Sequence, residues 1–188
     1  MNFSLKKILV LAVVIELFIL LAAYLINPLP EYTFRYAARY SGRFSLLVFL
    51  GAFYVYAKNY PTSFVKRTGL QNMLSLFAVI HIIHFVFLAL SVYLNKIPLE
   101  FVKVIGGFLA YAMIVIAPFK LAKVPLKITP VYFYYVSLVM ALTYVARIKG
   151  DFEGAEPFWF HYVALSVIAV SLMVFTVLIR KKKKVIDE

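Results

Sequence analysis

Six long apolar runs, separated by short polar and charged clusters, make up most of this chain. An α-helix needs roughly 20 mostly apolar residues to cross a bilayer, and all but the second run come close to that length. The second run is short unless the helix before it continues into it. The pattern predicts an all-α integral membrane protein, a single domain of six transmembrane helices over about residues 8–26, 44–57, 71–94, 101–117, 130–146 and 158–179.

The composition supports a membrane protein and excludes several other classes. Hydrophobic residues make up 64% of the 188 residues, charged residues only 15%, and the mean hydropathy is +0.92. The chain has no cysteine, which excludes disulfides, iron–sulfur clusters and thiolate zinc sites. The net charge of +12 does not predict nucleic-acid binding, because the basic residues flank apolar runs. In such positions they set topology and meet the anionic head groups of membrane lipids.

The distribution of basic residues predicts the orientation. Six spans place both termini on one side, and that side carries about twice as many Lys and Arg residues as the other. Because cytoplasmic loops are enriched in basic residues, we expect both termini in the cytoplasm and the protein in the plasma (inner) membrane. The first run is expected to be an uncleaved anchor. The acidic loop at residues 147–157 and the connector at residues 27–43 should then face outward.

The connector carries two stripes with helical spacing. Arg35, Arg39 and Arg43 recur every four residues, and a parallel tyrosine stripe accompanies them at Tyr32, Tyr36 and Tyr40. Residues four apart lie on one face of a helix. We expect an interfacial helix whose tyrosines lie at head-group level and whose arginines meet lipid phosphates. The alternative is that an arginine binds an anionic cofactor group or a partner protein.

Three ionisable residues fall inside the predicted spans, where they are expensive to bury and often functional. Glu16, His81 and His84 all lie near mid-bilayer by their distance from the span ends. At matched depth, Glu16 could hydrogen-bond a histidine, which would offset the burial of both groups. The alternatives are packing groups between helices, haem ligation, a proton relay beside a redox site, or, least favoured, metal binding by Glu16 with a histidine.

The third histidine, His161, begins the sixth run beside Trp159 and Tyr162. Its expected place is the outer interface, solvated or bonded to a loop. It should lie about 5 Å inside the outer boundary and His84 about 15 Å inside it. The two histidines are therefore expected to differ in depth by roughly 10 Å, too much for one haem unless helices move.

Several short motifs occur in a fixed order along nearly the whole chain and point to one family. They are Asn27-Pro28, Ser41-Gly42-Arg43-Phe44-Ser45-Leu46, the basic pair Lys66-Arg67, Asn72-Met73-Leu74-Ser75-Leu76-Phe77-Ala78, His84-Phe85, and Pro98 followed by Gly106. In these features the chain resembles the ferric-reductase-like transmembrane family, which are six-helix b-type cytochromes. It looks most similar to the small bacterial haem subunit that feeds electrons to the periplasmic methionine sulfoxide reductase.

The resemblance implies haem b, with His84 as an axial ligand or His81 in its place, and with Arg39 or Arg43 neutralising the propionates. The chain also departs from the family, which holds haem between histidines of the third and fifth helices. The fifth run has no histidine, and Pro130 and Thr143 stand about where the pair is expected. A haem with one histidine, a haem that also uses His161, and a haem-free relative all stay open.

We therefore expect a membrane electron-transfer subunit that passes electrons from a quinone or a cytosolic reductase to an outer protein partner. The alternative from another class is a haem-free membrane anchor or assembly subunit of a larger complex, in which Glu16, His81 and His84 hold helices together. The third hypothesis is a small transporter or proton pathway that uses the same three residues. The sequence has no evident inverted repeat or broken mid-membrane helix that would favour this hypothesis.

Overall fold

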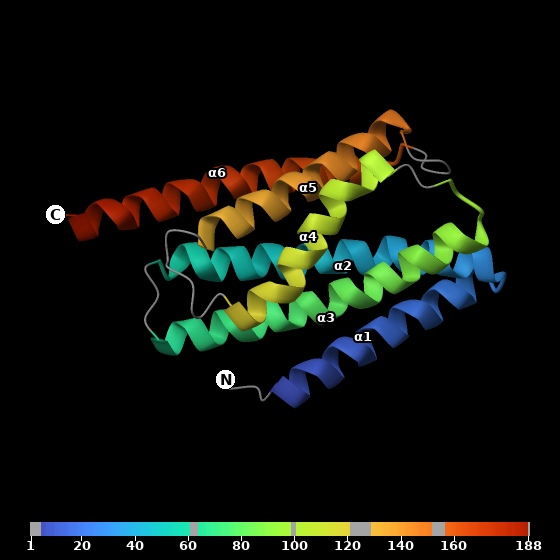
Figure 1. Ribbon diagram of the computed structural model, residues 1–188, viewed down its shortest axis with the longest axis horizontal. Helices are drawn as coiled ribbons and strands as arrows, with labels where there is room; N and C mark the ends of the chain where they lie inside the picture. The colour runs from blue at the N-terminus through green and yellow to red at the C-terminus, as the bar shows by residue number, and fades with distance from the viewer. Residues whose placement is uncertain (1–4, 61–63, 99–100, 121–128, 152–156, 188) are drawn as a thin grey trace.

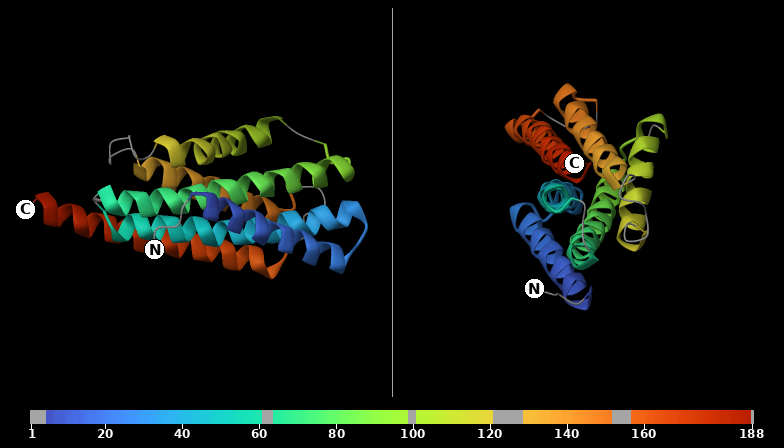
Figure 2. Two further views of the ribbon diagram at one scale, coloured as in Figure 1. Left: turned by 90° about the horizontal axis from the view of Figure 1, so that it is seen from below. Right: turned by 90° about the vertical axis from the view of Figure 1, so that its left-hand side faces the viewer.

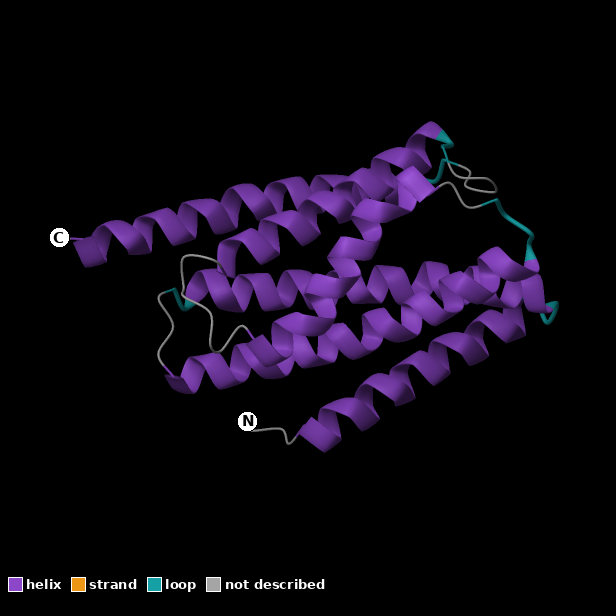
Figure 3. Cartoon of the chain, in the orientation of Figure 1, coloured by secondary structure: helices purple, strands orange, loops and turns teal. Residues whose placement is uncertain are grey.

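The computed structural model describes residues 5–60, 64–98, 101–120, 129–151 and 157–187, and within them every regular element is an α-helix (Figure 3). The six helices are α1 (Leu5–Ile26), α2 (Pro30–Lys58), α3 (Phe64–Leu94), α4 (Phe101–Lys120), α5 (Thr129–Lys149) and α6 (Trp159–Asp187). The predicted all-α class is confirmed. Each helix covers one of the six predicted runs, apart from residue 158 at the start of the sixth.

Successive helices run in alternating directions, and all but α4, which crosses the others obliquely, follow the long axis of the bundle (Figure 1). The beginning of α1 and the end of α6 therefore lie toward the same end of the bundle, which we call the terminal end; the opposite end is the distal end. Among the described residues, four helices are long and apolar enough to cross a membrane: α1, α3, α5 and α6. The apolar part of α4, Ile105–Lys120, is shorter. The chain thus has the helices expected of a multi-pass membrane protein.

Helix α2 is the central element of the bundle. It packs against α1, α3 and α6, and the end-on view places it between α1 and α6 (Figure 2). Its face toward the bundle carries small residues that bring helix backbones close together. Those that are buried are Ala37, Ala38, Ser41, Ser45, Ala52 and Ala57.

The structure corrects the expectation of a separate interfacial helix in the connector. Helix α2 is 29 residues long and joins most of the connector to the second apolar run. It begins at Pro30, whose fixed backbone angle suits the first turn of a helix. The side chain of Thr33 donates a hydrogen bond of 2.7 Å to the carbonyl of Asn27, which closes the turn from α1. The arginine and tyrosine stripes therefore belong to a helix of the bundle.

Asn95 joins the distal ends of α2 and α3. Its side-chain amide donates to the carbonyl of Glu31 at 3.1 Å, and its carbonyl accepts a hydrogen bond from the Arg35 guanidinium. Arg35, the first arginine of the stripe, is thus bound to the side-chain amide of Asn95.

An aromatic core fills the terminal half of the bundle. Phe53 stacks on Phe133 at a ring-centroid distance of 4.7 Å, and Tyr56 stacks on the same ring at 4.9 Å. Phe49 lies 5.2 Å from Phe77, which brings α3 into the same cluster. These rings are buried, and offset or edge contacts at such distances add to the packing energy. The core fixes α2, α3 and α5 relative to one another.

The packing of α5 changes along its length. All of its buried residues lie in the first half, from Thr129 to Ser137. From Leu138 to Lys149, no described side chain is fully buried. The distal half of α5, which carries Tyr144 and Arg147, is therefore packed more loosely than the terminal half.

Parts of three loops lie outside the described residues: residues 61–63, residues 121–128 and, in the predicted acidic loop, residues 152–156. The helix at Lys66 and Arg67 is described but their side chains are not.

Replacing Phe133 with alanine should destabilise the protein by roughly 3 kcal/mol, because the cavity would remove the ring contacts that join α2 and α5. Thermal unfolding in mild detergent would measure this. Phe108→Ala is the matched control, since Phe108 of α4 is 74% exposed at the bundle surface. Equal losses in the two variants would contradict the assignment of Phe133 to the core.

Candidate functional site

Two serines of α2 organise the polar groups inside the bundle. Ser41 and Ser45 are one helical turn apart and fully buried, so they lie on one face. Ser41 donates a hydrogen bond of 2.9 Å to Oε1 of Glu16 on α1. The Ser45 hydroxyl and Nδ1 of His81 on α3 are hydrogen-bonded at 2.6 Å. We call Ser41, Gly42 and Ser45 the polar face of α2.

These contacts differ from one of the alternatives drawn from the sequence, a hydrogen bond between Glu16 and a histidine. The partner of Glu16 is Ser41. Glu16 is only 1% exposed, and its Oε2 has no hydrogen-bond partner among the described residues. Both α1 and α3 therefore attach their ionisable groups to α2 and not to each other.

His81 is surrounded on several sides by protein. Its ring stacks on Tyr111 of α4 at 4.6 Å and lies 5.1 Å from Phe77. With Ser45 at Nδ1, the imidazole has a polar partner and an aromatic cover. Such a histidine serves well as a packing group between α2, α3 and α4.

His84 is held differently, against the backbone of α2. A Cβ atom placed on Gly42 would come within 3.0 Å of Cε1 of His84 and within 3.5 Å of both ring nitrogens. The ring is hydrogen-bonded to the backbone of Ala38. Its Nδ1 atom is buried and has no hydrogen-bond partner among the described residues. His84 thus has a buried ring nitrogen, Nδ1, that no described residue bonds, and in the His81 ring Nδ1 is bonded to Ser45.

A group of basic side chains in the distal half interacts electrostatically, and one member, Arg147, also acts on His84. The group consists of Arg39 and Arg43 of α2, Arg147 of α5 and His161 of α6. We call Arg39, Arg43, Arg147 and His161 the distal cationic cluster. Within the described part of the chain, no acidic side chain pairs with Arg43 or Arg147. Like charges gathered in a place of low dielectric favour the binding of an anion.

Aromatic rings hold Arg43 in this cluster. Its guanidinium lies 4.3 Å from the ring centroid of Phe160, 5.4 Å from that of Phe158 and 5.6 Å from that of Tyr40. Rings at such distances attract a cation through their π-faces. These contacts fix α2 against the start of α6 and leave the hydrogen-bond donors of Arg43 without an acidic acceptor in the described residues.

His161 lies at the start of α6, as expected, but it is buried. Its Nδ1 accepts a hydrogen bond of 3.4 Å from the backbone N–H of Phe158, just before the helix. Tyr144 of α5 lies 6.1 Å from its ring. Arg147 is within electrostatic reach of both His161 and His84. The structure thus brings His161 into the cationic cluster, where the sequence predicted an isolated interfacial residue.

Sequence reasoning missed Arg147 and Tyr144. Arg147 was assigned to the outer acidic loop, and Tyr144 was assigned to the fifth apolar run without a role. Helix α5 continues to Lys149 and so carries Arg147 into the bundle. The serines were missed as well, although their spacing around Gly42 in an apolar helix is a readable signal. No group of three or more His, Cys, Asp or Glu side chains converges in the described part of the chain to hold a metal ion.

We compared the chain with protein-family models, with curated proteins and with solved structures, and found no match in any of the three. The resemblance to the ferric-reductase-like family therefore stays a prediction from the motifs.

Substituting Gly42 with alanine should weaken the packing of α3 on α2, because the new methyl group meets the imidazole of His84 at 3.0 Å. We expect a loss of about 1–3 kcal/mol in unfolding free energy, measured by thermal unfolding in detergent. Gly51→Ala on the same helix is the control. There the Cβ meets only the flexible end of Met73, at 3.2 Å, and the helix propensity of alanine favours the variant. A tolerated Gly42→Ala would refute the close contact.

The Ser41→Ala variant should lose roughly 1 kcal/mol, because the carboxyl of Glu16 would lose its described hydrogen-bond donor. Combining it with Glu16→Leu should recover stability, since an apolar pair replaces both polar partners. The double-mutant cycle is measured by thermal unfolding. Additive losses in the double variant would mean that Glu16 and Ser41 do not depend on each other.

Proposed function

We propose that this chain is a six-span electron-transfer subunit of the plasma membrane, with both termini in the cytoplasm. The alternating directions of the helices support a common side for the two termini (Figure 1). The excess of basic residues on that side supports the cytoplasm. On this proposal the terminal end faces the cytoplasm, and the distal end, with its cationic cluster, faces outward.

The observation that carries the proposal is Nδ1 of His84, which is buried and has no hydrogen-bond partner among the described residues, within electrostatic reach of Arg147. An imidazole nitrogen is a common axial ligand of haem iron. Haem b also carries two carboxylates, which need cationic partners in a membrane. The donor set therefore fits the group: His84 would hold the iron, while Arg43 and Arg147 would neutralise the propionates. Arg39 is a further candidate for the propionates.

His161 would be a further candidate to hold the group, because α6 brings it into the same cationic cluster. His81 is the less favoured ligand, since Tyr111 covers its ring. When bound, haem b supplies a one-electron couple. The residues around it would keep water away on the terminal side, where the aromatic core closes the bundle. A quinone or a cytosolic reductase would supply electrons, and a protein partner outside would accept them.

A haem-free anchor or assembly subunit is the second candidate, and the polar face of α2 favours it. The hydrogen bonds of Ser41 and Ser45 join α1, α2 and α3 without any cofactor. In this reading the histidines determine how the helices pack, and the function is to hold a partner protein at the membrane.

An absorption spectrum separates these two functions. We expect protein purified from haem-supplied cells to have a Soret band that shifts on dithionite reduction, with sharp α and β bands. The His84→Ala variant should lose these bands, because it removes the iron ligand, and His161→Ala should change the spin state or lower haem content. His81→Ala is the matched control and should keep the spectrum.

A featureless spectrum of the wild-type protein would overturn the electron-transfer proposal and leave the anchor function. A spectrum that His84→Ala leaves unchanged would overturn the ligand assignment alone. Circular dichroism of each variant verifies that the helices are retained.

A further inference from the structure

The imidazole of His84 lies directly against the backbone of α2. A Cβ atom at position 42 would come within 3.0 Å of its Cε1 and within 3.5 Å of each ring nitrogen, so the ring occupies the room that the missing side chain of Gly42 leaves. Because both nitrogens are equally near this backbone, their hydrogen bonds decide how the ring is held.

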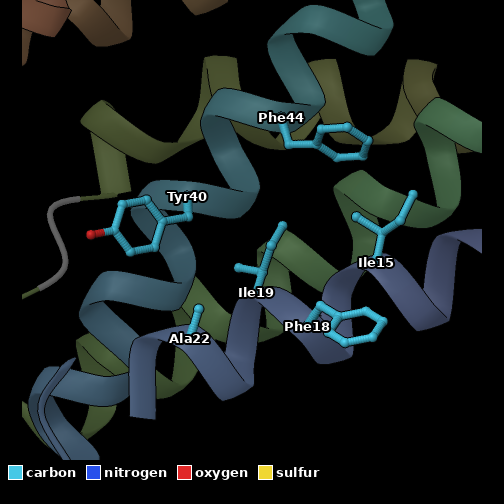
Figure 4. Close-up of a pocket in the computed structure, with 6 residues that line it drawn as sticks. All are labelled: Ile15, Phe18, Ile19, Ala22, Tyr40 and Phe44. Atoms are coloured by element: carbon cyan, nitrogen blue, oxygen red, sulfur yellow. The ribbon is translucent and has the colours of Figure 1, made fainter. Parts of the chain in front are cut away.

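The opposite side of this stretch of α2 carries bulky side chains. Tyr40 and Phe44 line an apolar groove beside α1 (Figure 4). Residues two apart lie on roughly opposite sides of a helix, so Gly42 is turned away from the groove. The gap at position 42 is therefore used by α3, through His84, and not by α1.

The two nitrogens of the His84 ring have different surroundings. The ring is hydrogen-bonded to the backbone of Ala38, and Nδ1 has no hydrogen-bond partner among the described residues. The bond to Ala38 is therefore made by Nε2. Ala38 lies inside α2, where each backbone N–H already donates to the carbonyl of the preceding turn. Only the carbonyl of Ala38, which has a second lone pair, can take a further bond, so Nε2–H is the donor.

This hydrogen bond sets the tautomer of the neutral ring. An imidazole that donates from Nε2 carries its lone pair on Nδ1. His81 is held differently, because the hydroxyl of Ser45, 2.6 Å from its Nδ1, can either donate to that atom or accept from it. A backbone carbonyl can only accept, so of the two histidines of α3 it is His84 whose tautomer is determined by its partner.

We propose that Gly42 and the carbonyl of Ala38 are positioning groups for His84. Gly42 lets the ring reach the helix backbone, the carbonyl of Ala38 accepts the hydrogen bond from Nε2–H, and Nδ1 is left as the ligand atom. A metal-binding histidine that donates its other N–H to a carbonyl is held in one orientation and becomes a more basic ligand. The identity of the ligand as haem iron rests on the proposed function, whereas the tautomer of the ring does not.

Nuclear magnetic resonance of the whole protein in mild detergent, prepared without haem and with isotope-labelled histidine, tests the tautomer. The chain has three histidines, so His81→Gln and His161→Gln assign the signals. We expect His84 to carry its proton on Nε2, in slow exchange with water and in contact with the α protons of Gly42. A proton on Nδ1, or an Nε2 proton without contact to Gly42, would overturn the proposal.

The Gly42→Ala variant should release the ring from the Ala38 carbonyl, because the new methyl group meets Cε1 of His84 at 3.0 Å. The Nε2 proton should then exchange rapidly with water. Gly51→Ala is the matched control and should keep slow exchange at His84, since its Cβ meets only the end of Met73. A slowly exchanging Nε2 proton in folded Gly42→Ala would contradict the role of Gly42. Circular dichroism verifies the fold, and the wild-type signals test the Ala38 bond independently of this variant.

A methylated histidine separates the ligand atom from the proposed function. Replacing His84 with Nδ-methylhistidine blocks Nδ1 and should abolish the Soret band of protein from haem-supplied cells, whereas the same replacement at His81 should keep it. Haem bands that survive the change at His84 would overturn Nδ1 as the ligand atom and leave the electron-transfer proposal standing. A wild-type protein without haem bands would overturn that proposal, while slow exchange of the Nε2 proton would still support the roles of Gly42 and Ala38.

Discussion

The close contact between the backbone of Gly42 and the imidazole of His84 determines how near α2 and α3 can lie. A side chain at position 42 would push α3 away. It would also separate Ser45 from His81, which are hydrogen-bonded one turn deeper. Because α2 also holds α1 through Ser41 and Glu16, the position of three helices depends on this one face. In an apolar medium a buried polar group needs a partner, so these contacts allow few alternatives.

The terminal and distal halves of the bundle differ in the side chains that fill them. The terminal half is filled by aromatic rings around Phe53 and Phe133, which exclude water and leave no room for a cofactor among them. The distal half contains arginines, histidines and Tyr144, and the distal part of α5 has no fully buried side chain. Such an arrangement can accept a charged group from one side of the membrane and isolate it from the other.

The existence and order of the helices could be predicted from sequence, because apolar runs of membrane length are a strong signal. The contacts of individual side chains could not. The depth of Glu16 and His84 was inferred from residue counts, but counts along separate helices say nothing about which faces meet. The partner of Glu16 is Ser41, which no count of residues along α1 and α3 could indicate. Arg147 was placed in a loop, since the hydropathy pattern does not reveal that α5 continues past Ala146.

The short turn between α1 and α2 has a consequence for how the chain enters the membrane. Only residues 27–29 separate the two helices, so they can insert together as a helical hairpin. Glu16 on its own would face lipid during insertion, and an acidic side chain at the centre of a helix is unfavourable by about 3 kcal/mol on insertion scales. In the hairpin, Ser41 already lies beside it. The hydrogen bond that holds α1 in the finished bundle would therefore also offset part of the free-energy cost of placing Glu16 in the bilayer.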